Sequence, residues 1–269
     1  MRIVRFAPVE GGPPKYGWAE GQRAGLITGD PFGTYRREDP RLALGELQLV
    51  APLVPGKIVC VARNYLAHAQ EHGVELPEVP LLFLKPPSAV IGPGQAIELP
   101  PQSDRIEHEA ELAVVIGRRA RDVTPEEAAA HILGYTVAND VTARDLQQRD
   151  GQWTRAKGFD TFCPLGPWIE TAVDPAGLRI VCRVNGVIRQ MASTQDMVFS
   201  VPQLVAYISG VMTLEPGDVV LSGTPEGVGR LADGDTVEID IQGIGMLRNV
   251  VRLAASGRAA APAIRRSIS

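Results

Sequence analysis

EHEAELAVVIG, at residues 107–117, and YTVANDVTARD, at residues 135–145, are the two stretches around which this chain is organised. In the first, acidic residues alternate with other residues before a continuous apolar run begins. Residues i and i+2 of a strand lie on one face, roughly 6.6 Å apart along the chain, so Glu109 and Glu111 point the same way. Asp140 ends the second apolar segment and is the candidate for a third carboxylate.

Three carboxylates in one place repel one another unless they are protonated or neutralised by a cation. A hard divalent ion suits them, because Mg²⁺ prefers oxygen ligands and keeps several of its waters. The alternative is a half-exposed strand with an acidic outer face, which is common because many strands keep one face in water. The alternating pattern alone leaves both interpretations open.

Composition and charge exclude several classes of protein. The net charge is −4 over 269 residues and the pI is near 5.7, which argues against a general nucleic-acid binder. Three widely spaced cysteines indicate neither a disulfide framework nor a CxxC metal site, and we expect each to be a small buried hydrophobe. The N-terminus lacks a signal-peptide core, and no apolar run approaches the ~18 residues of a membrane span, so we expect a cytoplasmic protein.

The chain divides into three predicted parts. Residues 1–52 are expected to form a small N-terminal accessory β unit, with strands at 1–6, 16–20 and 23–27. The Pro- and Gly-containing stretch at 52–56 marks the boundary to a catalytic domain at 53–254. Residues 255–269 are expected to be a flexible basic tail.

Within 53–254 strands outnumber helices, which favours an α+β fold with a mixed sheet over a Rossmann or TIM architecture. Asn64 is a candidate cap for a short helix that runs toward residue 73. Capping boxes predict helices after Thr124 and Ser200, and Asn185-Gly186 predicts a hairpin across residues 178–191. Further strands are expected at 57–62, at 81–85 and from residue 218 onward.

Several side chains outside the acidic stretch suit chemistry. His68 and Glu71 are three apart on a predicted helix and share a face, which is how an imidazole is oriented as a general base, or they are a surface pair. Lys157, in a segment rich in Gly, Pro and aromatics, could bind a carboxylate or enolate oxygen, or it is a solvated lysine. Arg144 and Gln147 are donors suited to a carboxylate, or they lie on a helix surface.

The loop at 222–229, SGTPEGVG, follows a predicted strand, and its glycines would allow the backbone to approach an anion closely. It is no P-loop, because the GxxxxGK[ST] pattern is absent. A tight structural turn accounts equally well for this loop when it is taken alone.

Taken together, these motifs resemble the fumarylacetoacetate hydrolase family. The resemblance rests on the ordered series RNY at 63–65 with His68 and Glu71, FLKPPSA at 83–89, HEAELAVVIG at 108–117, NDVTARD at 139–145, AKGFDTFCPLGPW at 156–168, VNG at 184–186 and SGTPEGVG at 222–229. It covers residues 57–253 and leaves residues 1–50 and the tail largely uncovered.

The resemblance implies a mixed β-sheet roll, a site for Mg²⁺ or Mn²⁺ and a homodimer. It places the metal ligands on Glu109, Glu111 and Asp140. It places catalytic residues on His68, Glu71 and Lys157, and it places the threonine of the GTP loop on Thr224. We also expect substrate contacts from Arg63, Tyr65, Arg144, Gln147 and Thr224. Glu107 has no counterpart in the motif, so we expect it outside the metal ligands and expect Glu107→Gln to be tolerated.

The implied chemistry passes through an enolate of a 2-oxo or 2-hydroxy-2-ene carboxylic acid. A single catalytic copy with a short β unit resembles the isomerase and decarboxylase members that act on 2-hydroxyhepta-2,4-diene-1,7-dioate in aromatic catabolism. Retention of His68 and Glu71 keeps two alternatives open, namely C–C bond hydrolysis of an acylpyruvate or fumarylacetoacetate type and oxaloacetate decarboxylation. A hypothesis of another class is a non-catalytic protein that binds a metal or an organic acid.

Overall fold

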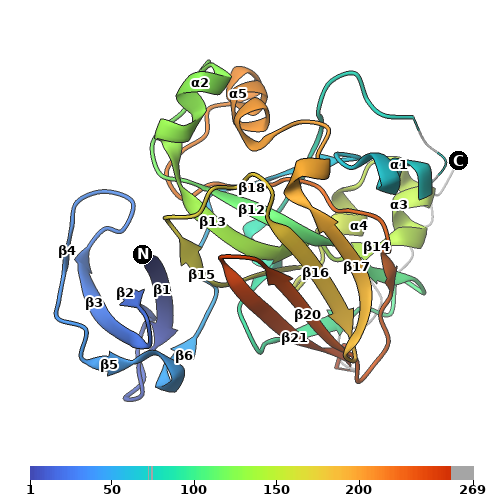
Figure 1. The fold of residues 1–269 in the computed structure, drawn as a ribbon. Coiled ribbons are helices and arrows are strands. Elements are labelled where there is room, and N and C mark those ends of the chain that lie inside the picture. The colour runs from blue at the N-terminus through green and yellow to red at the C-terminus, as the bar shows by residue number, and fades with distance from the viewer. Residues whose placement is uncertain (72, 74, 256–269) are drawn as a thin grey trace, which may run out of the picture.

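The computed structural model describes residues 1–71, 73 and 75–255. Their fold is α+β and rich in strands, as the sequence predicts (Figure 1). The predicted tail lies outside the described residues except for residue 255. Among the described residues, no helix is long and apolar enough to cross a membrane.

The largest sheet runs in the order β4-β3-β2-β1-β15-β13-β12-β18-β7-β8, and β5, β6 and β9 pair beside this path. Its strands are β1 (Arg2–Ala7), β2 (Lys15–Glu20), β3 (Arg23–Gly29), β4 (Tyr35–Arg37), β5 (Leu42–Ala43), β6 (Gln48–Leu49), β7 (Ile58–Ala62), β8 (Leu81–Lys85), β9 (Val90–Ile91), β12 (Ala110–Ile116), β13 (Ile132–Asn139), β15 (Cys163–Glu170) and β18 (Val219–Leu221).

Strand β12 is buried along its whole length because it has apolar layers on both faces. Leu112 and Val114 belong to one hydrophobic cluster, whereas Ala113 and Val115 belong to another. A strand covered on both faces reads as a continuous apolar run, which explains why the acidic alternation stops after Glu111. Each fully buried Val or Leu contributes about 1.5–3 kcal/mol of transfer free energy, so β12 anchors the sheet.

The sheet closes back on itself through β9. This strand follows β8 in the chain and pairs in parallel with β15, where Val90 lies opposite Cys163. The chain that leaves one edge of the sheet therefore returns to its middle. The enclosed cluster includes Cys60, Ala113 and Cys163 from three strands. The predicted β-roll is therefore observed.

A second sheet packs on one face of the central strands β12 and β13 of the first (Figure 1). It runs in the order β10 (Ala96–Leu99), β21 (Gly245–Leu253), β20 (Thr236–Ile241), β16 (Arg179–Val184) and β17 (Val187–Ser193). Ile180 and Ile239 of this sheet share a cluster with Leu112 of β12. A small sheet of β14 (Thr142–Ala143), β11 (Ile106–His108) and β19 (Gly229–Arg230) lies beside the acidic residues.

The N-terminal strands extend the main sheet. β1, β2 and β3 match the three predicted strands of residues 1–52, and β1 pairs antiparallel with β15, with Arg2 opposite Glu170. The N-terminal amine lies 3.1 Å from Glu170 Oε1, and Thr171 N donates to the Met1 carbonyl at 3.0 Å. This unit is thus joined to the rest of the chain by backbone pairing.

The helices are α1 (Leu66–Glu71), α2 (Pro125–Ala128), α3 (Arg144–Asp150), α4 (Thr154–Lys157) and α5 (Val201–Val211), with short 3₁₀ turns at Leu44–Glu46, Pro87–Ala89, Ala129–His131 and Thr194–Asp196. Both predicted capping boxes form, at Thr124 and Ser200. The predicted hairpin forms as β16 and β17, with positive φ at Asn185 and Gly186.

The predicted cap of the first helix is wrong. Asn64 is fully buried, and its amide donates to the carbonyls of Phe199 at 3.0 Å and Ser222 at 2.8 Å. Its Oδ1 accepts the Phe199 N–H at 2.7 Å. Asn64 therefore joins two distant loops, because a buried amide must satisfy its hydrogen bonds wherever partners lie.

Candidate metal centre and its pocket

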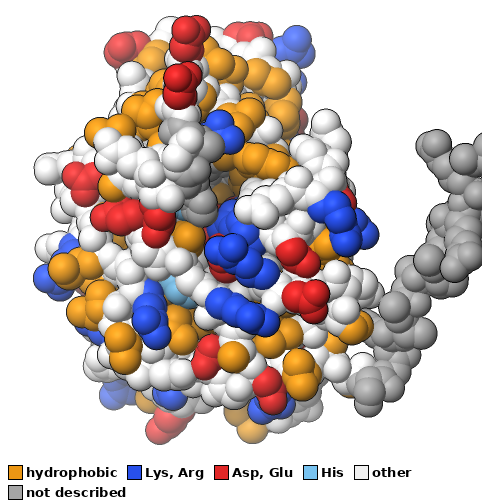
Figure 2. All heavy atoms as spheres, turned by 90° about the vertical axis from the view of Figure 1, so that its right-hand side faces the viewer, with side chains coloured by type: hydrophobic (Ala, Val, Ile, Leu, Met, Phe, Trp, Pro, Cys, Tyr) orange, Lys and Arg blue, Asp and Glu red, His pale blue; other side chains and the backbone are white. Residues whose placement is uncertain are grey.

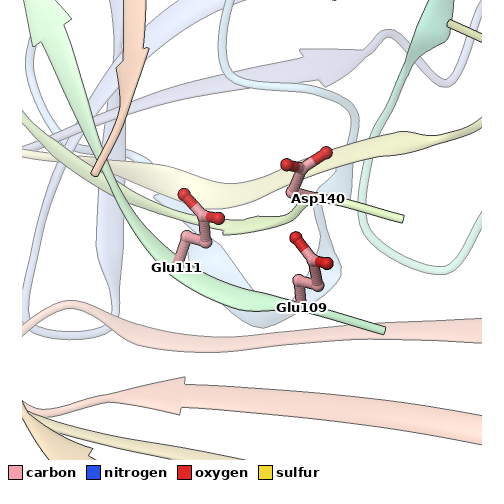
Figure 3. Close-up of side chains that lie close together, drawn as sticks. All are labelled: Glu109, Glu111 and Asp140. Atoms are coloured by element: carbon pink, nitrogen blue, oxygen red, sulfur yellow. The ribbon is translucent and has the colours of Figure 1, made fainter. Parts of the chain in front are cut away.

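The three predicted metal carboxylates meet at one edge of the main sheet. β12 begins where the antiparallel β13 ends, since Ala110 lies opposite Asn139. Glu109 precedes β12, Glu111 lies within it, and Asp140 directly follows β13, with the Asp140 N–H donating to the Glu109 carbonyl at 2.9 Å. Figure 3 shows the three side chains facing one another. One ligand oxygen from each lies within 4.8 Å of the other two, and all three residues are buried.

Burial and mutual repulsion disfavour three negative charges here. The pKa of Glu111 is raised well above its ordinary value by burial and then by the charges of Asp140 and Glu109. Burial alone would also raise the pKa of Glu109, but Lys157 and Arg144 outweigh it and hold this pKa far below its usual range. The cluster is thus polarised, with Glu109 ionised and Glu111 the carboxylate that most needs a cation.

Lys157 bridges two of the carboxylates. Its Nζ donates to Glu109 Oε2 at 2.9 Å and to Asp140 Oδ2 at 2.7 Å. Burial would lower the pKa of Lys157, but Asp140 and Glu109 outweigh burial and raise it, so the ammonium group stays charged. The ring of Phe83 lies 4.8 Å from Nζ, within the range of a cation–π contact. The solvated-lysine interpretation is therefore wrong.

Lys85 is a second buried ammonium that the sequence reasoning did not select. It ends β8, and its Nζ donates to Asp140 Oδ1 at 2.6 Å and to the Val141 carbonyl at 3.1 Å. The available signal was its place in the FLKPPSA motif, at the end of a predicted strand.

Arg144, at the start of α3, joins the cluster through Glu109 and Glu107. Its Nη2 donates to Glu109 Oε1, and its Nε donates to Glu107 Oε2 at 2.7 Å. Arg105 Nε donates to the other oxygen of Glu107 at 2.6 Å. Glu107 thus stays outside the metal cluster, as predicted, but it is buried between two guanidinium groups. Its predicted tolerance of Gln requires revision, because the structure gives this carboxylate a buried ion pair.

These residues fit a divalent cation. Among residues 1–71, 73 and 75–255, three buried cations, from Lys85, Arg144 and Lys157, pair with the four buried carboxylates Glu107, Glu109, Glu111 and Asp140 as a group. Glu111 pairs with none of the three, and the one hydrogen bond to its carboxylate within the described part of the chain comes from the Gly223 N–H at 2.7 Å. The donor set consists of carboxylate oxygens, the ligands that Mg²⁺ and Mn²⁺ prefer.

A cavity of about 280 Å³ opens onto the carboxylates. Of the other predicted residues, it is lined by Arg63, His68, Arg144, Gln147, Lys157 and Thr224. Its wall also contains Val61, Ala62, Phe83, Gln148 and Trp153, which sequence reasoning did not select. The rings of Phe83 and Trp153 meet edge to face at 5.3 Å. A small cavity with polar groups and one aromatic wall suits a small acid.

Tyr65 and Glu71 are not among the described residues that line this cavity. Tyr65 is buried, and burial followed by the charge of Glu111 raises its pKa. Glu71 Oε2 lies 3.4 Å from His68 Nδ1, which is long for a hydrogen bond. The Glu71 carboxylate instead accepts the Gly227 N–H at 3.1 and 3.2 Å. The predicted roles of both residues stay predictions.

Thr224 is held by Gln190, a buried residue that the sequence did not reveal. Gln190 Oε1 accepts the Ala110 N–H at 3.0 Å, and its Nε2 donates to the Pro225 carbonyl at 2.8 Å. These two contacts fix the amide orientation, because a backbone N–H only donates and a carbonyl only accepts. The same Nε2 donates to Thr224 Oγ1 at 2.8 Å, and this hydroxyl donates its only proton to the Ala110 carbonyl at 2.9 Å.

The fixed amide also sets the tautomer of His108. The His108 Nδ1 lies 3.1 Å from Gln190 Oε1, so Nδ1 carries the proton. Burial lowers the pKa of His108, although the hydrogen bond to Gln190 opposes this shift. A neutral His108, Gln190 and Thr224 thus form one network beside the acidic strand, and Thr224 is its member that lines the cavity.

Comparisons with known proteins agree with this architecture. The family profile of the fumarylacetoacetate hydrolase C-terminal domain matches residues 57–252, and a profile described as Rv2993c-like, N-terminal, matches residues 1–52. The structure of 2-hydroxyhepta-2,4-diene-1,7-dioate isomerase from Mycobacterium marinum is 46% identical in sequence with a TM-score of 0.86, and the match covers 95% of this chain and 99% of that chain.

Two further relatives are named for other reactions. The mitochondrial oxaloacetate tautomerase FAHD2A of Bos taurus is 45% identical over 225 residues, which are 79% of this chain and 72% of that protein. Maleylpyruvate hydrolase from Sphingobium sp. SYK-6, solved in complex with manganese(II) ion and pyruvate, is 34% identical with a TM-score of 0.77 and covers 94% of this chain and 100% of that chain. The family has both isomerases and hydrolases among its members, and this chain belongs to the fumarylacetoacetate hydrolase family.

Proposed function

We propose that this protein is a divalent-metal-dependent isomerase that interconverts the enol and keto forms of 2-oxo carboxylic acids. The observation that carries the proposal is the meeting of three buried carboxylates, the charged Lys157 and His68 in one cavity. The relatives named for 2-hydroxyhepta-2,4-diene-1,7-dioate isomerisation and oxaloacetate tautomerisation support it, because both reactions move a proton between an enol oxygen and a carbon.

Glu109, Glu111 and Asp140 would hold Mg²⁺ or Mn²⁺, which supplies a Lewis acid for negative charge on the substrate's 2-oxygen. Lys157 adds a fixed positive charge beside the same carboxylates. Arg144 Nη1 donates to Gln147 Oε1 at 2.6 Å, so the Gln147 NH₂ group is turned away from Arg144 and can donate to the substrate carboxylate.

His68 would move the proton. Ketonisation removes a proton from the 2-hydroxyl group and delivers one to a carbon of the enol system, so no atom is lost or gained. The imidazole lines the cavity, and Glu71 lies next to it on the same face of α1. General acid–base catalysis of this kind contributes about 10²- to 10⁴-fold to rate.

Isomerisation is placed before hydrolysis because the relatives named for isomerisation and tautomerisation are 46% and 45% identical to this chain, whereas maleylpyruvate hydrolase is 34% identical. C–C bond hydrolysis is the second candidate, because catalytic hydrogen bonds such as one between His68 and Glu71 often tighten only when substrate is bound. Decarboxylation of oxaloacetate would use the same enolate and differ in releasing CO₂.

A single assay panel separates these reactions. Enol oxaloacetate, 2-hydroxyhepta-2,4-diene-1,7-dioate and an acylpyruvate would each be followed by ultraviolet absorbance, with Mg²⁺ and with EDTA, while products and CO₂ are quantified. We expect Mg²⁺-dependent loss of enol absorbance without cleavage or CO₂, and a large loss of rate in Lys157→Ala and His68→Ala. Cleavage products would establish a hydrolase instead. Binding without turnover on the whole panel would make this a non-catalytic organic-acid binding protein.

A further inference from the structure

Arg63, which lines the cavity, has an unusual backbone conformation. It lies between β7 and α1 and has a φ of +58°, in the left-handed region that a side chain with a Cβ disfavours. Such a conformation persists only where its surroundings impose it, and it gathers at ligand sites. Here the next residue imposes it, because Asn64 is fully buried and holds Phe199 and Ser222 through three hydrogen bonds.

The sheet places Arg63 on the same edge as the acidic cluster. β7 and β18 are parallel, with Cys60 opposite Leu221, so the residues that follow both strands emerge together. β18 in turn runs antiparallel to β12, which puts the end of β18 beside the start of β12. Arg63 and Thr224 thus line one cavity with Glu111.

Two of the three cations that line the cavity have carboxylate partners, and Arg63 is the third. Lys157 pairs with Glu109 and Asp140, and Arg144 pairs with Glu109 and Glu107. No carboxylate among the described residues pairs with Arg63. Figure 2 shows the face with α1 and α3, where basic side chains gather around a hollow.

We propose that Arg63 binds the second carboxylate of the substrate and thereby selects dicarboxylic 2-oxo acids over monocarboxylic ones. The inference rests on the proposed function, because it assumes that the acidic cluster takes the 2-oxo acid head. A planar guanidinium group can donate two parallel hydrogen bonds to a carboxylate, a geometry that lysine does not reproduce.

The kinetic test compares two substrates that differ only in the distal charge, namely oxaloacetate and its 4-methyl ester. In Arg63→Met, kcat/KM for oxaloacetate should fall about 10- to 100-fold, as expected for one lost charge-assisted contact, while kcat/KM for the ester changes less than about threefold. Arg63→Lys should recover only part of the loss. An equal loss on both substrates would overturn the proposal.

Two variants control for folding. Arg63→Gly removes the side chain and also relieves the positive φ, so it should fold at least as stably as the native chain and show the same substrate selectivity as Arg63→Met. Arg36→Met, on exposed β4, removes an arginine away from the cavity and should leave selectivity unchanged.

A binding measurement separates failure of this inference from failure of the proposed function. With Mg²⁺ present, the native protein should bind malate about 10- to 100-fold more tightly than lactate, because both offer a 2-hydroxy acid head and only malate has a second carboxylate. Arg63→Met should abolish this difference whether or not the protein turns over any substrate. Retention of the difference in Arg63→Met, or its absence in the native protein, would disprove the role of Arg63.

Discussion

Lys85 Nζ donates to Asp140 Oδ1 at 2.6 Å, and both side chains are buried. Lys157 Nζ donates to the other oxygen of the same carboxylate at 2.7 Å, so each oxygen of Asp140 accepts a hydrogen bond from one ammonium group. The plane of the carboxylate is thereby fixed before any ligand arrives. Such supporting contacts orient metal ligands in many proteins.

Removal of Lys85 should therefore weaken the fold in a way that a metal ion repairs. Lys85→Met leaves a buried carboxylate without one of its partners, and we expect a loss of about 3–5 kcal/mol in the free energy of unfolding in EDTA. Mg²⁺ should restore part of this loss, because it supplies positive charge to Asp140. Denaturant unfolding with and without Mg²⁺ measures both quantities.

Lys57→Met is the matched control, because Lys57 pairs with Asp218 away from the acidic cluster. The loss in the free energy of unfolding caused by Lys57→Met should be the same in EDTA and in Mg²⁺. If the cost of Lys85→Met is also independent of Mg²⁺, then Lys85 does not act through the proposed metal ligand.

Substitutions in the acidic stretch should separate metal ligands from their support. Glu109→Gln and Asp140→Asn should each lower Mg²⁺ affinity by more than about 100-fold, since even outer partners of a metal site cost about 10- to 100-fold. Glu107→Gln should retain the metal but cost about 1–3 kcal/mol of stability, because Arg144 and Arg105 lose a charged partner. Calorimetric titration with Mg²⁺, paired with thermal unfolding, checks these values.

Comparable Mg²⁺ affinity in Glu109→Gln and Glu107→Gln would argue against the assigned ligand set. An unaltered stability of Glu107→Gln would show instead that its ion pairs with the two arginines contribute little.

Glu111 should make the stability of the metal-free protein depend on pH. Its pKa in the folded chain is well above the ordinary 4.5, because of burial and the charges of Asp140 and Glu109. A group whose pKa is raised by folding stabilises the protein below its unfolded pKa, and this contribution is lost as the pH rises through the folded pKa. In EDTA, Glu111→Gln should therefore gain stability relative to the native chain as the pH rises above the ordinary pKa of 4.5, by up to about 1.4 kcal/mol per pH unit.

Mg²⁺ should reverse the comparison at the higher pH, because the native chain gains a ligand-bound state that the variant lacks. Thermal unfolding of both proteins across the pH range, with EDTA and with Mg²⁺, gives the four curves required. A stability difference that does not vary with pH in EDTA would show that folding does not raise the pKa of Glu111.

Thr224 should recognise a hydrogen-bond donor on the substrate. Its only hydroxyl proton goes to the Ala110 carbonyl while Gln190 Nε2 donates to its oxygen, so the hydroxyl offers the cavity a lone pair. Thr224→Val should raise KM for an enol substrate about 3- to 10-fold, the range of one neutral hydrogen bond. It should leave the inhibition constant of oxalate nearly unchanged, because ionised oxalate has no proton to donate.

Thr224→Ser is the conservative control and should keep the native KM. A loss of oxalate affinity as large as the rise in KM would mean that Thr224 donates to the substrate, contrary to the observed hydrogen bonds.

Local patterns in the sequence were sufficient for several elements. The capping boxes at Thr124 and Ser200 and the hairpin at Asn185 depend on contacts between residues a few positions apart. Such contacts depend on residues that are close in the sequence, so they can be predicted without knowledge of the tertiary structure. The cap predicted at Asn64 was wrong because its amide bonds to Phe199 and Ser222, which are remote in the chain.

The sequence by itself determined that Glu109 and Glu111 share a face, because alternation along an extended strand leaves no other arrangement. Only the tertiary structure decided which side chains contact this acidic stretch and Asp140. Lys85 lies 55 positions from Asp140, and Gln190 lies 80 positions from Ala110. Contacts of this length depend on strand order and on the closure of the sheet through β9 onto β15. Backbone preferences act over a few residues and carry no information about that order. The contacts of the two ammonium groups, the Thr224 network and the position of Arg63 in the cavity are therefore established only when the sheet is assembled.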